Sequence, residues 1–107
     1  MKAVAYHYWA ENCGPCMKLK PSMLEMKEDF EDDVEWVSVD VRNTKTDLIQ
    51  RYGVGPIPCL VVVVKNDVGK DIYSEKCTDR QSVAPYFKVM RNAKAYIKNN
   101  STPQSST

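Results

Sequence analysis

The stretch Trp9-Ala10-Glu11-Asn12-Cys13-Gly14-Pro15-Cys16 is the part of the sequence that indicates the fold most directly. The residues that lead into it, Val4 to Trp9, are β-branched and aromatic and predict a short strand. After it, apolar side chains recur every three or four positions, which is the spacing of one helix face. They are Cys16, Leu19, Met23, Met26 and Phe30. The stretch therefore joins a strand directly to a helix, and its two cysteines lie at the start of that helix.

Two features mark the course of this helix. Pro21 removes one backbone hydrogen bond, so we expect a kink there and not a break, because the apolar stripe continues past it. The acidic cluster that begins at Glu28 and continues to Asp33 ends the helix, and acidic residues extend to Glu35. We interpret it as a solvated surface, since it has neither the spacing nor the glycine of a calcium-binding loop.

The middle of the chain predicts a second strand and a short helix. Val34 to Val41 alternates apolar and polar residues, as a half-buried strand does. In the helix that follows, Thr44 and Asp47 resemble a capping box, and Tyr52-Gly53 supplies a glycine stop.

The second half of the chain predicts a hairpin and a last helix. Leu60 to Val64 is a continuous apolar run, as in a strand buried on both faces. Asn66 to Gly69 predicts a turn, and Lys70 to Lys76 predicts the returning strand. An amphipathic C-terminal helix is marked by Val83, Phe87, Met90, Ala93 and Ile97.

The predicted element order is β-α-β-α-β-β-α. It forms one domain, residues 1–100, followed by a polar tail, residues 101–107, that has no reason to order. Alternating strands and helices imply parallel pairing, while the closing hairpin adds antiparallel strands. We therefore expect an α/β fold with a mixed four-stranded sheet and helices on both faces.

Composition excludes several classes of function. The chain is 43% hydrophobic and 27% charged, as in ordinary soluble domains. Its formal net charge of +1 provides no field for nucleic-acid binding. Its longest apolar run, Leu60 to Val64, is far shorter than the roughly 20 residues of a membrane-spanning helix. We expect a monomer with no nucleic-acid partner and no membrane span, and, without a recognisable export signal, a cytoplasmic location.

The two cysteines of the opening stretch suit disulfide chemistry. Cys13 lies at the helix entrance, where unpaired N–H groups and the helix dipole favour a thiolate, so it is the expected nucleophile. Cys16 lies on the buried stripe, close enough to attack a mixed disulfide at Cys13, so it is the expected resolving thiol. The alternative is half of a zinc site, which needs two more ligands. Because a strand–CxxC–helix context favours redox chemistry, we expect no metal and no cofactor besides the Cys13–Cys16 disulfide.

The opening stretch, together with Pro21, Tyr52-Gly53-Val54 and Ile57-Pro58, resembles the thioredoxin family over nearly the whole chain. The resemblance implies that Cys13-Gly14-Pro15-Cys16 holds the redox pair and that the Ile57-Pro58 bond is cis. It also implies that the Ile57 backbone faces the disulfide and pairs with a substrate chain, and that Trp9 shields the disulfide. Because the sequence begins at what resembles the family's second strand, we expect the usual first strand and helix to be missing, leaving a minimal core closer in size to glutaredoxins.

Three positions depart from the family pattern. His7 stands where thioredoxins have a buried Asp, and an imidazole titrating near neutrality could relay the proton of the resolving thiol. His7 could equally be a packed strand histidine with one hydrogen bond. Asn12 replaces a Trp, and Gly55-Pro56 precedes Ile57. Both positions rim the family's substrate groove, so we expect altered partner choice with the same chemistry. Trp36 is interpreted as a core residue only.

Two further cysteines have open roles. Pairing of their strands could bring Cys59 and Cys77 together, as a second disulfide or a redox-sensitive thiol. We favour the other interpretation, two small buried hydrophobic residues, because free cysteine is among the most buried residue types.

The resemblance implies a thiol–disulfide oxidoreductase that reduces disulfides in protein substrates and is regenerated by a thioredoxin-reductase-like enzyme. One alternative is a glutaredoxin-like protein served by glutathione. Cys77-Thr78-Asp79, expected at the start of the last helix, resembles a glutathione-binding stretch, although Glu75-Lys76 replaces its usual glycines. The other alternative is a binding subunit of a larger enzyme with idle cysteines.

Overall fold

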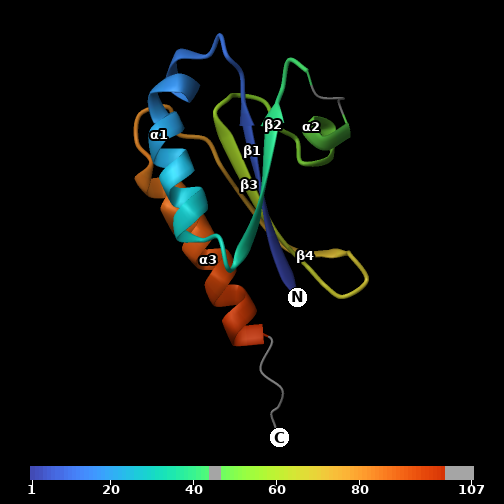
Figure 1. Ribbon diagram of the computed structural model, residues 1–107. Coiled ribbons are helices and arrows are strands. Elements are labelled where there is room, and N and C mark those ends of the chain that lie inside the picture. Colours follow the sequence, from blue (N-terminus) through green and yellow to red (C-terminus); the bar gives the residue numbers. More distant parts are fainter. Residues whose placement is uncertain (44–46, 101–107) are drawn as a thin grey trace, which may run out of the picture.

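The computed structural model describes residues 1–43 and 47–100. The proposed capping residue Thr44 and the tail 101–107 lie outside these ranges. The elements of the described chain confirm the predicted order β-α-β-α-β-β-α (Figure 1). They are β1 Lys2–Trp9, α1 Gly14–Asp29, β2 Val34–Asp40, α2 Asp47–Arg51, β3 Cys59–Lys65, β4 Asp71–Cys77 and α3 Ala84–Asn100.

The four strands form one mixed sheet in the order β2-β1-β3-β4. β1 and β2 are parallel, with α1 as the crossover between them, whereas β3 is antiparallel to both β1 and β4. The predicted α/β class is therefore confirmed. Because β1 is an inner strand, Trp9 and the loop that follows it lie near the centre of the sheet, at the end where β1 terminates. The segment with the two cysteines begins there.

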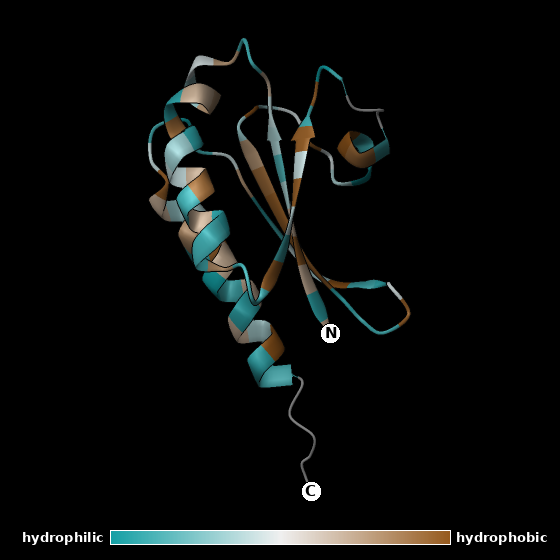
Figure 2. Cartoon of the chain, in the orientation of Figure 1, coloured by the Kyte–Doolittle hydropathy of each residue, from teal (hydrophilic) through white to brown (hydrophobic). Residues whose placement is uncertain are grey.

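Helices cover both faces of the sheet, as the sequence predicts. α1 and α3 pack on one face and α2 on the other (Figure 1). β3 is apolar along most of its length because it serves both cores (Figure 2), and its residues 59–64 are all buried. On the α2 face, the Tyr8 hydroxyl donates to the Leu48 carbonyl at 2.9 Å and fixes α2 to the sheet.

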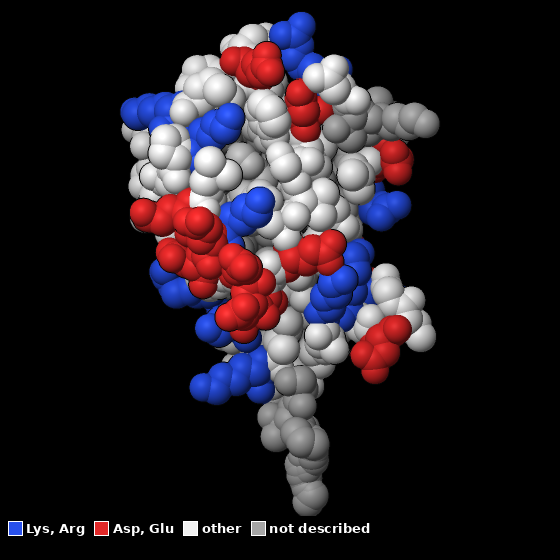
Figure 3. All heavy atoms as spheres, viewed as in Figure 1, with Lys and Arg blue, Asp and Glu red and all other residues white. Residues whose placement is uncertain are grey.

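The stripe of α1 is buried as predicted. Cys16, Leu19, Met23 and Met26 are the buried residues of this helix, and Phe30 caps its end. The helix continues past Pro21, which is exposed. Acidic side chains gather over the end of α1 and the loop that follows (Figure 3), where Lys94 pairs with Asp33. This cluster is a solvated surface, as the sequence indicates.

The helix α3 presents a slightly different face to the core from the one the sequence predicts. Its buried residues are Tyr86, Val89, Met90 and Ala93, whereas Phe87 and Ile97 are half-buried. The tyrosine was not part of the predicted stripe, because a residue with a hydroxyl group counts as polar until its partner is known. None of the helices in the described part of the chain combines the length and the apolar character needed to cross a membrane.

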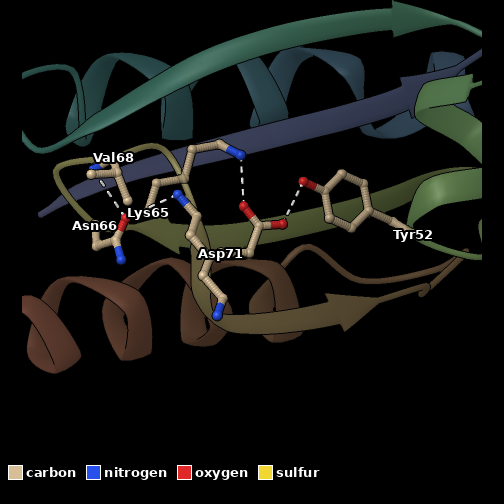
Figure 4. A network of polar contacts seen from close by, with 6 residues as sticks. Tyr52, Lys65, Asn66, Val68 and Asp71 are labelled. Atoms are coloured by element: carbon tan, nitrogen blue, oxygen red, sulfur yellow. Dashed lines mark hydrogen bonds and ion pairs between the residues drawn. The ribbon is translucent and has the colours of Figure 1, made fainter.

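The β3–β4 hairpin is fixed by polar contacts at its turn (Figure 4). The Asn66 side-chain oxygen accepts the N–H groups of Val68 and Lys70 at 3.1 and 2.9 Å. Gly69 then adopts a φ of 81°, a conformation that favours glycine. β4 begins and ends one residue later than the predicted range.

A second contact joins the base of this hairpin to the segment after α2. The Asp71 carboxylate accepts the Lys65 ammonium at 2.6 Å and the Tyr52 hydroxyl at 2.8 Å (Figure 4). Gly53, the predicted helix stop, has a φ of 60°. These contacts hold the segment that leads from α2 back into β3, and that segment carries Ile57 and Pro58.

Candidate active site

The start of α1 positions both cysteines. Cys13 has an extended backbone, with φ −97° and ψ 108°, and is the N-cap residue of the helix. Its Sγ accepts the backbone N–H of Cys16 at 3.1 Å. The two cysteines form a disulfide with their Cα atoms 5.2 Å apart. Cys13 is 8% exposed and Cys16 is 1% exposed, so the predicted difference in access between the two is present. An N–H group of this kind favours a thiolate on Cys13.

The Ile57-Pro58 peptide bond is cis, as the family resemblance implies. It lies beside the disulfide, and the Ile57 carbonyl oxygen is 3.8 Å from Cys13 Sγ. Pro58 is buried, and its own carbonyl oxygen lies 3.4 Å from the Tyr86 hydroxyl. The predicted placement of the Ile57 backbone next to the redox pair is confirmed.

The structure also places Arg80 next to Ile57. Arg80 is exposed in the loop between β4 and α3, and its Nη1 donates to the Ile57 carbonyl oxygen at 2.9 Å. Sequence reasoning missed it, because no local pattern distinguishes an exposed arginine in a loop. The contact spans 23 positions of the chain and exists only in the folded molecule.

Trp9 forms one wall of a cavity behind the disulfide. The cavity has a volume of about 160 Å³, and Cys16, His7 and Trp36 also line it. The Trp9 indole N–H donates to the Ser38 hydroxyl at 2.7 Å, and Trp9 packs against the cluster that contains both cysteines. Trp36 is half-buried with its ring 5.4 Å from that of His7, so its interpretation as a core residue only is incomplete.

His7 is 7% exposed, and its Nε2 has no hydrogen-bond partner among the described residues. Burial lowers the pKa of this imidazole from 6.5 to about 4, because the charged form would lose its water. The expectation of a group titrating near neutrality is therefore wrong. The alternative of a packed strand histidine is confirmed as to its burial, while its one hydrogen bond is not made at Nε2. At neutral pH, His7 is an uncharged ring facing the same cavity as Cys16.

The remaining predicted site residues surround Cys13 at the surface. Asn12 and Gly14 are exposed, and Pro15 is half-buried in the first turn of α1. A Cβ at Gly14 would meet nothing within 4 Å, so space does not require a glycine there.

The proposed second disulfide is absent, because Cys59 and Cys77 are both free. The residue opposite Cys77 on β3 is Leu60, one position beyond Cys59. Successive strand residues point to opposite faces, so Cys59 lies in the α2 core while Cys77 packs against the α1–α3 core. Burial raises the pKa of Cys59 to about 11. Its interpretation as a small buried residue is confirmed, whereas Cys77 is half-buried.

The zinc alternative finds no third ligand. Within residues 1–43 and 47–100, no three His, Cys, Asp or Glu side chains gather closely enough to hold a metal ion.

The stretch compared with a glutathione-binding site is not at a helix start. α3 begins at Ala84, so Cys77-Thr78-Asp79 lies at the end of β4 and in the following loop. The Asp79 carboxylate accepts the N–H groups of Gln81 and Ser82 at 2.8 and 2.7 Å, and these bonds lower its pKa. Two N–H groups of this loop are therefore already occupied by the chain's own carboxylate.

Comparisons with known proteins agree with this geometry. The thioredoxin family model matches residues 1–84. The chain is 37% identical over 76 residues to a thioredoxin of Streptomyces clavuligerus, which covers 70% of this chain and 68% of that one. It is 31% identical over 62 residues to a thioredoxin of Chlorobaculum thiosulfatiphilum, covering 58% and 56%. The chain thus spans little more than half the length of some of the curated thioredoxins that it matches.

Solved structures show the same fold. The Trx4 domain of ERdj5 superimposes with a TM-score of 0.67 at 20% identity, covering 94% of this chain and 82% of that one. Trichomonas vaginalis thioredoxin superimposes with a TM-score of 0.68 at 25% identity, covering 85% and 78%. From the matched residues, the disulfide at the helix start and the cis proline beside it, we conclude that this chain belongs to the thioredoxin family.

Proposed function

We propose that the protein is a thiol–disulfide oxidoreductase that reduces disulfides in protein substrates. The observation that carries this proposal is the Cys13–Cys16 disulfide at the start of α1, with the first sulfur reached by a backbone N–H and the second enclosed. A purely structural disulfide would not require this N-cap geometry or the Ile57 backbone beside it.

The reaction proceeds in two exchanges. In the reduced protein, the Cys13 thiolate attacks one sulfur of a substrate disulfide, and the other substrate sulfur leaves as a thiolate that takes up a proton. Cys16, once deprotonated, attacks Cys13 Sγ and expels the second substrate thiolate. The substrate gains two electrons and two protons, and the protein ends with the Cys13–Cys16 disulfide. The Cys16 N–H stabilises negative charge on Cys13 whenever that sulfur attacks or leaves.

The substrate chain would lie along the surface next to Cys13. The Ile57 backbone offers a pairing edge there, and Trp9, Asn12 and Pro15 rim the approach. A thioredoxin-reductase-like enzyme or glutathione would return the disulfide to its dithiol form. These partners suit a monomer working in a reducing compartment such as the cytoplasm.

His7 is proposed to assist the second exchange. It shares the cavity with Cys16, and its unpartnered Nε2 can hydrogen-bond to a water molecule there. Since burial holds its pKa at about 4, His7 stays uncharged at neutral pH, so its proposed role is to hold a water molecule through which the proton of Cys16 leaves, and not to take up that proton itself. His7→Leu should slow the resolution of a mixed disulfide at neutral pH; an unchanged rate would remove His7 from the mechanism.

The test compares single cysteine variants in the reduction of a protein disulfide, with insulin as substrate and dithiothreitol as electron source. Cys13→Ser should abolish the activity. Cys16→Ser, reduced and then separated from dithiothreitol before the substrate is added, should accumulate a mixed disulfide on Cys13, located by mass spectrometry. Cys77→Ser is the matched control and should keep the activity, because Cys77 lies outside the site.

Three outcomes would contradict the proposal. Activity retained in Cys13→Ser would remove the nucleophile. A persistent glutathione adduct on Cys13 of the unaltered chain would favour the glutaredoxin-like alternative. No reduction of any protein disulfide by the unaltered chain would favour a binding subunit with idle cysteines.

A further inference from the structure

We propose that Arg80 tunes the reactivity of Cys13 through the carbonyl group of Ile57, acting as a positioning residue that favours the thiolate. The inference rests on the proposed function, in which Cys13 is the attacking thiolate. Arg80 belongs to none of the sequence motifs of the site.

The contact geometry places a positive charge close to the sulfur. Arg80 Nη1 and Cys13 Sγ approach the same oxygen, at 2.9 Å and 3.8 Å. The guanidinium nitrogen therefore lies within about 7 Å of Cys13 Sγ, a distance at which unit charges still interact across a protein surface.

The loop that carries Arg80 is held on both sides. The Tyr86 hydroxyl, buried under the loop, donates to the Asp79 carbonyl at 2.5 Å and accepts the Asp79 N–H at 2.6 Å. The Asp79 side chain in turn accepts the N–H groups of the two residues that follow Arg80, Gln81 and Ser82. The backbone at Arg80 is therefore fixed, and the side chain starts from a set position relative to Ile57.

The carbonyl oxygen by itself would work against a reactive Cys13. A lone carbonyl oxygen next to this sulfur accepts the S–H of a thiol and repels a thiolate, so it raises the pKa of the cysteine. The guanidinium draws on the same oxygen and adds a positive charge nearby, and both effects favour the thiolate. At about 7 Å and partly exposed to water, the positive charge should still lower the pKa of Cys13, because it stabilises the thiolate.

Other charged groups around Cys13 do not replace this contact. Glu11 lies in the loop before Cys13 and shares a surface hollow with Asp40 and Arg42 at the end of β2. Lys20 lies over the Trp9 ring, 5.6 Å from its centroid. The buried His7 is neutral at pH 7, as its lowered pKa requires.

On the helix side of the site, Cys16 is the titratable group in contact with Cys13. Among the described residues, Arg80 is the charged side chain bonded to Ile57.

The experiment measures the alkylation of Cys13 by iodoacetamide as a function of pH, with peptide mass spectrometry to separate Cys13 from Cys59 and Cys77. The full chain carries Cys16→Ser, so that no disulfide re-forms. Onto this parent are placed Arg80→Met, Arg80→Lys and, as the matched control, Arg91→Met. Arg91 is exposed on α3 near Phe30, and Phe30 lies at the far end of α1, about 25 Å along that helix from Cys13. Thermal melting of each variant reports whether it is folded.

We expect Arg80→Met to raise the apparent pKa of Cys13 by roughly half a unit to one unit, with the same alkylation rate at high pH. The rate at neutral pH should fall by roughly three- to tenfold. Arg80→Lys should restore part of this loss because it keeps the charge, and Arg91→Met should match the parent. At about 1 M salt the difference between Arg80→Met and the parent should shrink.

Two results would overturn the inference. One is a pH profile of Arg80→Met that coincides with the parent. The other is a rate lowered equally at every pH with an unchanged midpoint, which would mean that Arg80 only shapes the surface. Failure of the proposed function looks different, because in that case the parent Cys13 itself would be no more reactive than Cys77.

Discussion

His7 should make the stability of this protein depend on pH below neutrality, and His7→Leu should remove that dependence. The imidazole is buried without a partner at Nε2, and its pKa in the folded protein is about 4. In the unfolded chain its pKa returns to the ordinary value of 6.5. At pH values between these two pKa values, His7 is protonated in the unfolded chain and uncharged in the folded protein. Lowering the pH through this window therefore favours unfolding, and the stability lost there is present again above it.

The size of the effect follows from the two pKa values. Each unit of difference is worth about 1.4 kcal/mol once both forms are titrated. The pKa falls from 6.5 to about 4. At about pH 4.5 the wild-type chain should therefore have lost about 2.5 kcal/mol through His7 alone, and at about pH 7.5 almost nothing.

The assay is urea unfolding of the oxidised protein at several pH values, with the free energy of unfolding compared between wild type and His7→Leu. Other titratable groups are common to both chains and cancel in the difference, which should grow by about 2.5 kcal/mol in favour of the variant from about pH 7.5 to about pH 4.5. Because His7 is the single histidine, NMR titration of its ring gives the folded pKa directly. Parallel stability curves, or a ring that titrates near 6.5, would refute the reasoning.

Three other predictions concern buried side chains. Leu60→Ala, at a fully buried position on β3, should lower the free energy of unfolding in urea by about 2–5 kcal/mol; a loss within error of zero would contradict this. Tyr86→Phe should cost about 1–3 kcal/mol, because it leaves the Asp79 backbone groups without their partner; calorimetry measures this, and an unchanged melting temperature would argue against the contact. In the folded protein, an aromatic disulfide reagent should modify Cys77 well before the buried Cys59; equal rates would contradict the burial.

Most of the fold could be predicted from local patterns in the sequence. The three-and-four spacing from Cys16 to Phe30 predicted α1 and its buried side, and the continuous run from Leu60 to Val64 predicted a strand buried on both faces. These predictions succeed because helix and strand periodicities are properties of neighbouring residues. The position of Cys13 at a helix start is local in the same way, so the redox pair could be read from the sequence.

The stripe of α3 shows the limit of that reading. Tyr86 is fully buried, and its hydroxyl bonds to Asp79, seven positions away. No periodicity indicates that a polar group will find its partner in a loop. Asp79, in the stretch whose sequence resembles a glutathione-binding site, likewise accepts the N–H groups of its own loop with its carboxylate.

The order of the elements, the α/β class and the pair Cys13–Cys16 could all be predicted from neighbouring residues in the sequence. Features that depend on residues far apart in the chain became visible only in the folded molecule. The strand register put Cys59 and Cys77 on opposite faces of the sheet, and the folded loops brought Arg80 to the Ile57 carbonyl. Burial set the pKa of His7, because desolvation depends on everything that packs around the ring and not on its neighbours in sequence.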